Sequence, residues 1–257
     1  GYTGANNKTW RATGSGSLLN FPGIITLTGN TFTNAALIVE ALNGGTIDLV
    51  GVTNIDGGHT QFSSSGANSQ IDLSTLSLFT DTGNGGSSIT TANNGTVTLS
   101  SGTTTIQKVS VFLESTGTLS VGTLNIGQNG ILSGNGVLTA NVVNDGIVKP
   151  GVTSGEINIL GAYTQTANGV LEIEVGGLDA GSQYDQLTVT GAVTLDGILN
   201  LSLLNGYIPN LGNVFTFITA NLISGTYAMV NGASIGNGNQ FQVNYGTSTV
   251  ALEVISE

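Results

Sequence analysis

The chain contains 257 residues, of which 40 are glycine, none is cysteine and only 7% are charged, and its formal net charge is −11. With only four lysine and arginine residues, the chain lacks the basic surface that binding to nucleic acid or to an anionic membrane needs. The absence of cysteine excludes disulfides, thiolate metal sites and cysteine nucleophiles. Because 39% of the residues are hydrophobic, the composition is typical of a folded chain and not of a disordered one.

The first forty residues are less regular than those that follow. Residues 1–15 are polar and glycine-rich, and we expect them to form a lid over an open end of the fold. Trp10, between Lys8 and Arg11, could alternatively be a platform on which a sugar ring stacks. Residues 17–40 carry three short apolar runs, which predict a first, looser coil.

Residues 44–121 repeat one short phrase four times, in which polar and aliphatic residues alternate. Its central aliphatic residues recur about every 24 positions, at Ile47, Ile71, Val97 and Leu119. Each period holds three short alternating runs separated by Gly, Asn and Ser. Such self-similarity predicts a solenoid of three-strand coils, with the central aliphatic residues in one interior column. A leucine-rich repeat would need a helix in each unit and a sandwich would not repeat in register, so both fit less well.

The pattern changes in the second half of the chain. Residues 122–150 carry shorter phrases that continue the architecture, and Pro150 with Gly151 marks the first strong break. Beyond it the apolar runs are longer and richer in aromatic residues. We therefore divide the chain into residues 1–150, an N-terminal cap with regular coils, and residues 151–257, a continuation of the coils or a β-rich cap.

Five runs in this half carry a family resemblance: residues 144–151, 161–166, 169–175, 184–191 and 197–201. They resemble the late passenger region of bacterial autotransporter adhesins, where such phrases close a right-handed parallel β-helix. The earlier coils resemble the β-helix repeats of very large surface proteins from cyanobacteria and planctomycetes. The resemblance covers about residues 40–220 and implies an all-β, right-handed parallel β-helix. No membrane-barrel translocator follows residue 257, so autotransport itself is not implied.

The candidate metal ligands are Asp48 and Asp72, which take the same outward position in successive coils. Stacked coils would place them about 5 Å apart. Either Ca²⁺ lies between the two carboxylates or both side chains splay into water. Asp179 and Asp185 flank a polar loop and form a second candidate cation site. We expect no other cofactor.

The sequence does not predict an enzyme. A glycosidase needs a carboxylate pair at a set separation, and a lyase of this fold would need clustered acids with a basic residue. The central coils hold no arginine, and Lys108 is their only lysine. The single histidine, His59, is expected in a turn, and Glu172 and Glu174 are expected on a solvated outer face. We therefore assign no catalytic residue.

These observations favour an extracellular or cell-surface structural or adhesive module. Met229 is the only methionine, which favours a secreted chain that has lost a leader. Open ends and edges favour a homo-oligomer or filament, such as a fibre, sheath or surface layer, and surface glycans are candidate partners. Nucleic-acid binding and membrane insertion are not expected. The alternative is a glycan-binding or glycan-cleaving β-helix. Ice binding by outward threonines fits less well, because Asp48 and Asp72 interrupt the flat array.

Overall fold

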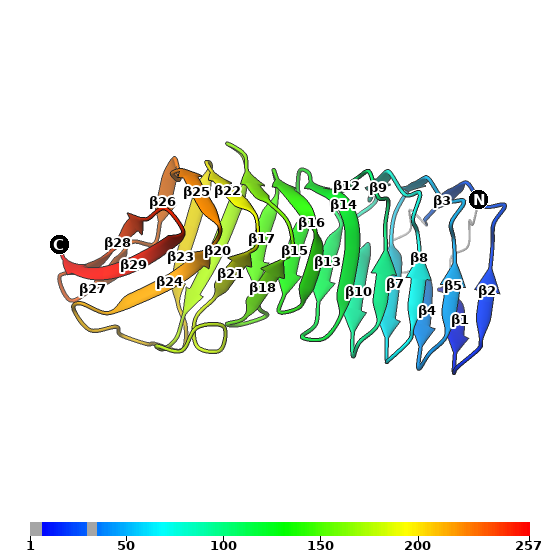
Figure 1. Cartoon of the computed structure of the whole chain (residues 1–257), viewed down its shortest axis with the longest axis horizontal. Helices are drawn as coiled ribbons and strands as arrows, with labels where there is room; N and C mark the ends of the chain where they lie inside the picture. Colours follow the sequence, from blue (N-terminus) through cyan, green and yellow to red (C-terminus); the bar gives the residue numbers. More distant parts are fainter. Residues whose placement is uncertain (1–6, 30–34) are drawn as a thin grey trace.

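The computed structural model describes residues 7–29 and 35–257, and within them every regular element is a β-strand. The strands wind into an elongated solenoid with three faces (Figure 1). The chain is therefore a parallel β-helix, and the predicted fold class is confirmed. No helix among the described residues is long and apolar enough to span a membrane.

The first face, sheet A, is a parallel sheet of 10 strands. They are β1 (Lys8–Thr13), β4 (Leu37–Leu42), β7 (Thr60–Ser65), β10 (Ser88–Ala92), β13 (Ser110–Leu113), β15 (Ile131–Gly134), β17 (Ile147–Pro150), β20 (Val170–Val175), β23 (Ile198–Leu203) and β26 (Met229–Asn231).

The second and third faces are joined into one sheet, because β14 (Thr118–Ile126) and β16 (Val137–Asn144) each turn the corner between them and pair on both sides. The other strands of the second face are β2 (Leu18–Asn20), β5 (Thr46–Asp48), β8 (Gln70–Asp72), β11 (Thr96–Thr98), β18 (Glu156–Ile159), β21 (Gln186–Val189) and β24 (Val214–Thr219). Those of the third are β3 (Thr26–Thr28), β6 (Asn54–Asp56), β9 (Leu78–Thr80), β12 (Thr103–Gln107), β19 (Tyr163–Gln165), β22 (Ala192–Leu195) and β25 (Leu222–Gly225).

The interior column predicted from the repeated phrase exists. Ile47 pairs with Ile71, Ile71 with Val97, and Val97 with Leu119, always in parallel register. Each of the four side chains is 0% exposed. Like therefore stacks on like along the axis, and every coil buries its apolar side against its neighbours.

The glycine at the start of the phrase is required by close packing of the coils. A Cβ on Gly117 would lie 2.3 Å from the carbonyl oxygen of Thr91, and a Cβ on Gly95 would lie 2.3 Å from that of Ser64. Both distances are far below van der Waals contact. At Gly95 and Gly117 the backbone of one coil therefore lies too close to the coil before it for a side chain to fit.

The parallel stack runs without interruption across residue 150, since β15 pairs with β17 and β17 with β20. The direction changes only at the end, where β29 (Thr249–Ser256) pairs antiparallel with β24, and β28 (Asn239–Tyr245) with β29 and β27 (Ser234–Gly236). Phe241 of β28 packs edge-to-face on Phe215, 5.9 Å between ring centroids. The C-terminal region is thus a continuation of the coils that ends in an antiparallel cap (Figure 1).

The segment around Trp10 is not a lid, as far as the described residues go. It forms β1, which pairs with β4 over six residues and so belongs to the first coil. Trp10 packs on Phe21, with ring centroids 4.9 Å apart. Residues 1–6, the remainder of the predicted lid, lie outside the described residues.

Candidate functional site

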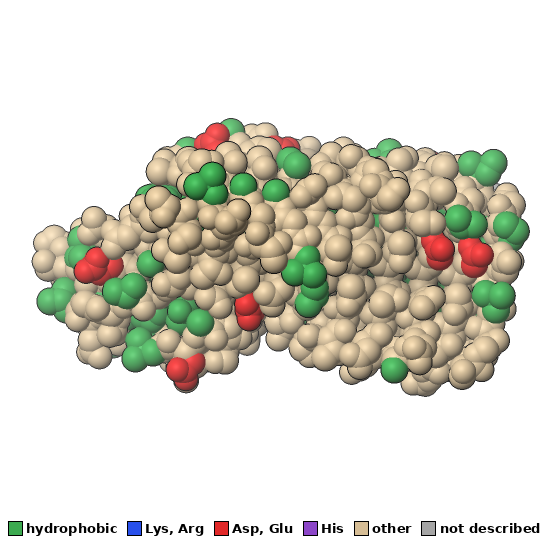
Figure 2. Space-filling view, viewed as in Figure 1, with side chains coloured by type: hydrophobic (Ala, Val, Ile, Leu, Met, Phe, Trp, Pro, Cys, Tyr) green, Lys and Arg blue, Asp and Glu red, His purple; other side chains and the backbone are tan. Residues whose placement is uncertain are grey.

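The two predicted calcium ligands lie next to each other on the outer surface of the second face. Asp48 ends β5, Asp72 ends β8, and the two are paired in register. Oδ1 of each accepts a backbone N–H two residues further on, from Val50 at 3.0 Å and from Ser74 at 2.8 Å. Each carboxylate therefore stabilises the bend that follows its strand. Figure 2 shows two acidic side chains side by side where β5 and β8 lie.

The column of Asp48 and Asp72 is short. The next strand places Thr98 beside Asp72, and the strand before places Asn20 beside Asp48. Calcium usually takes about six to eight oxygen ligands. The described residues contain no group of three or more His, Cys, Asp or Glu that could hold a metal. Calcium binding by Asp48 and Asp72 stays a prediction.

The most perturbed acid is Asp185, which lies before β21 and is 0% exposed. Its Oδ1 accepts the backbone N–H of Gly155 at 2.9 Å, and its Oδ2 accepts that of Glu174 at 2.8 Å. Burial raises the pKa of the Asp185 carboxyl to about 8, and the charge of Glu174 adds to the rise. The backbone donors and the charge of Lys149 oppose it, in that order. The raised pKa favours the protonated form of Asp185.

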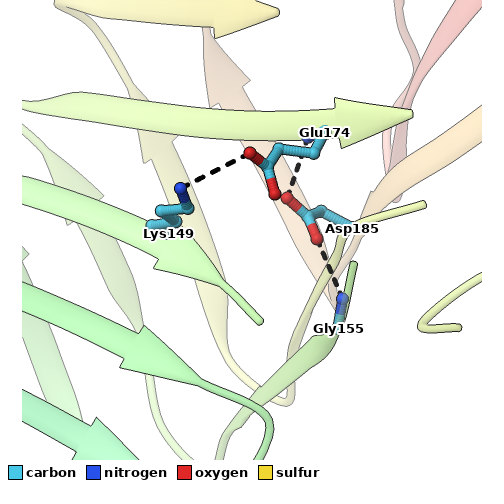
Figure 3. Close-up of polar contacts among 4 residues, drawn as sticks. All are labelled: Lys149, Gly155, Glu174 and Asp185. Carbon is cyan, nitrogen blue, oxygen red and sulfur yellow. Dashed lines mark hydrogen bonds and ion pairs between the residues drawn. The ribbon is translucent and has the colours of Figure 1, made fainter. Parts of the chain in front are cut away.

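Glu174, at the end of β20, lies beside Asp185 (Figure 3). Its Oε1 is 3.4 Å from Nζ of Lys149. Its Oε2 is buried and has no hydrogen-bond partner among the described residues, and Figure 3 shows this carboxylate turned toward that of Asp185. A proton on Asp185 would supply the donor that Oε2 lacks. The two acids thus lie next to each other at this corner of the solenoid.

The expectation that Glu174 lies on a solvated face is wrong. The side chain does point outward from β20, but it is only 17% exposed. The long corner of residues 176–185, which joins β20 to β21, returns here, since Asp185 binds the backbone of Glu174.

The acid pair does not line the pocket at its corner of the solenoid. A shallow pocket of about 290 Å³ lies at the same corner of the solenoid, but its lining residues are Thr153, Ser154, Gly176, Ser182, Gln183, Leu204 and Asn205. Neither Glu174 nor Asp185 reaches it. Through the N–H groups of Gly155 and Glu174 that it binds, Asp185 joins neighbouring coils.

The side chains of Asp179 and Asp185, the second candidate cation site, do not point toward a common site. Asp179 lies on the exposed part of the loop, where its backbone carbonyl accepts the N–H groups of Gln183 and Tyr184. The side chain of Asp185 points inward, and both of its carboxyl oxygens accept hydrogen bonds from backbone N–H groups. The loop is ordered by its own hydrogen bonds, and its two acids have separate surroundings.

A buried polar network links three strands inside the solenoid, and the sequence analysis missed it. Nδ2 of Asn144 lies 3.1 Å from the hydroxyl oxygen of Tyr163, and the Tyr163 hydroxyl donates to Oε1 of Gln165 at 2.8 Å. Nε2 of Gln165 donates to the carbonyls of Gly169, Asp196 and Ile198. All three side chains are almost fully buried. Burial raises the pKa of the Tyr163 hydroxyl well above its ordinary value.

His59 lies in the bend between β6 and β7 with φ of 39°, as the turn prediction requires. Its Nε2 is 3.3 Å from Nε2 of Gln61.

Comparison with known protein families and with curated proteins finds no match to this chain. The resemblance to autotransporter passengers therefore stays a prediction, and function has to be inferred from the fold and these groups.

Proposed function

We propose that the chain is a structural module of the cell exterior, a rigid spacer or adhesive scaffold that performs no catalysis. One observation carries this proposal: a single core runs unbroken from Ala12 in β1 to Val254 in β29. Nine strand spacings along sheet A give a rod about 43 Å long before the cap is added. A solenoid whose coils all share one core forms a single elongated body, which suits a spacer.

The location outside the cell is supported by composition. The chain is poor in lysine and arginine, with four in all, and is rich in glycine and in small polar residues.

Surface labelling of the source cells tests the proposal. Antibodies raised against the folded chain should decorate intact cells, and mild protease treatment should remove the signal. Labelling only after the cells have been permeabilised would contradict an exterior role. A screen of polysaccharides should detect no depolymerisation, and any cleavage would contradict the structural role.

Glycan binding is the second candidate, and one feature favours it. A groove of about 570 Å³ runs beside β17 and β20, lined by Gln128, Asn129, Asp145, Gly146, Ile147, Asn168 and Val170. Amide and carboxylate groups next to two aliphatic side chains could bind the hydroxyls and the apolar face of a sugar. None of its lining residues is aromatic, so we rank it second. If the chain binds a glycan on an array and Asn168→Ala abolishes that binding, glycan binding would become the favoured function.

A further inference from the structure

Lys149 of β17, Glu174 of β20 and Asp185 before β21 lie together at one corner of the solenoid (Figure 3). Nζ of Lys149 is 3.4 Å from Oε1 of Glu174, which is direct contact without a water molecule between them. Lys149 is also the only lysine or arginine after residue 108. The one side-chain amine of this half of the chain therefore touches a carboxyl group that has a second acid beside it.

The pair differs from Arg11 and Glu40, the other ion pair within the described ranges. Arg11 is 54% exposed and its guanidinium lies 2.6 Å from the carboxylate of Glu40. The contact of Lys149 is longer, its side chain is only 31% exposed, and Oε2 of Glu174 is buried without a hydrogen-bond partner in the described part of the chain. An unsatisfied buried oxygen destabilises the folded state, and a reaction that expelled Oε2 would remove that cost.

We propose that Lys149 and Glu174 condense to an amide, so that a covalent bond between their side chains joins β17 to β20. The ammonium and the carboxylate give one amide and one water. Nζ bonds to Cδ of Glu174 and releases two protons, and Oε2 leaves with both of them as water. No oxidant, reductant or further reactant is needed. The reaction occurs once in each molecule, and it goes beyond the scaffold function proposed above.

Asp185 supplies the acid for this condensation. Figure 3 shows the carboxylate of Glu174 turned toward that of Asp185, and the N–H groups of Gly155 and Glu174 hold the Asp185 carboxyl in place. Burial raises the pKa of Asp185 to about 8, which favours a proton next to the oxygen that leaves. Asp185 gives this proton to Oε2 as the C–O bond breaks and takes one from Nζ, so it ends as it began.

The amide crosses the shortest strand pairing of sheet A. β17 and β20 pair over two residues, Ile147 with Val170 and Val148 with Leu171, whereas β20 and β23 pair over six. β17 ends at Pro150, which has no N–H to donate to a neighbouring strand. The bond therefore holds two coils together where the backbone ladder is weakest, and residues 25 apart in the chain become linked.

Intact mass spectrometry of the full chain in denaturant tests the proposal. The parent chain should weigh one water less than its sequence, and peptic digestion should release a branched peptide that joins Lys149 to Glu174. Lys149→Ala and Glu174→Ala should each show the full mass of their sequence. Lys108→Ala is the matched control and should keep the water loss, because Nζ of Lys108 contacts the carbonyl of Gly83 and not a carboxylate. Asp185→Asn should slow the water loss after refolding about a hundredfold.

A parent chain with the full mass of its sequence would overturn the proposal. So would a water loss that persists in Lys149→Ala, since imide formation at an Asp-Gly step expels the same water, and three such steps begin at Asp56, Asp145 and Asp196. An unchanged rate in Asp185→Asn would contradict the role of that acid. The mass of the parent needs no variant, so it decides the proposal even where a variant fails to fold. Surface labelling of cells is a separate assay, so failure of the amide bond and failure of the scaffold function can be told apart.

Discussion

Replacing Asp185 with asparagine should flatten the pH dependence of stability. In the folded protein the pKa of the Asp185 carboxyl is raised from 3.8 to about 8, whereas in the unfolded chain it returns to its ordinary value. The folded state therefore holds a proton that the unfolded state has released between these two pH values. Its stabilising contribution is complete below about pH 4 and is lost as the pH rises toward 8.

The size of this effect follows from the shift. The rise from 3.8 to about 8 corresponds to roughly 6 kcal/mol, spread over the interval as at most about 1.4 kcal/mol per pH unit. Asparagine cannot ionise, so this slope should vanish in the variant. Its amide has one acceptor where the carboxyl supplies two, so at pH 5 we expect Asp185→Asn to be about 1–3 kcal/mol less stable than the parent chain.

Guanidinium unfolding at pH 5, 6, 7 and 8 measures both effects. The deficit of Asp185→Asn should shrink steadily as the pH rises, and should be reversed near pH 8. Asp179→Asn, an exposed change in the same loop, is the matched control and should leave the slope unchanged. Parallel stability profiles for the parent and Asp185→Asn would refute the assignment of a buried, protonated carboxyl.

Three further changes test the packing of the coils. Tyr163→Phe should lower the free energy of unfolding by about 1–3 kcal/mol in guanidinium, because its hydroxyl links buried amides. Val97→Ala should cost about 2–4 kcal/mol because it leaves a core cavity, whereas Thr98→Ala, an exposed neighbour, should change stability by about 0.5 kcal/mol or less. Gly117→Ala should lower the thermal midpoint sharply because its Cβ meets a carbonyl, whereas Gly23→Ala has open space; equal midpoints would contradict the close coil contact.

The coil architecture could be predicted because it depends on a local pattern. Each coil repeats an aliphatic residue between two polar ones, and the columns of Ile47 and Ile71 follow directly from that period. The antiparallel cap could not be predicted in the same way. The reversal at β29 depends on which edge the last strand meets, and no residue in its sequence marks that choice.

The acid pair was missed for a different reason. Its contacts join Gly155, Glu174 and Asp185, which lie in three different segments of the chain. One signal was present: Asp185 alternates with the buried residues Leu187 and Val189, so its side chain points to the same inner face. An acid at an inward position predicts burial, a raised pKa and a need for donors. The same alternation places Asn144 and Gln165 inside the solenoid.

The central claim is that successive wraps of the chain stack along one axis with a constant spacing. Pulsed electron resonance between paired spin labels measures this directly, with unlabelled protein in excess to suppress signals between copies. Labels at Gln61 and Ile147, then Val170, then Ile198, occupy one outward column. The account predicts distances of about 19, 24 and 29 Å, one strand spacing more at each step. Distances that fail to grow with each added wrap would contradict it.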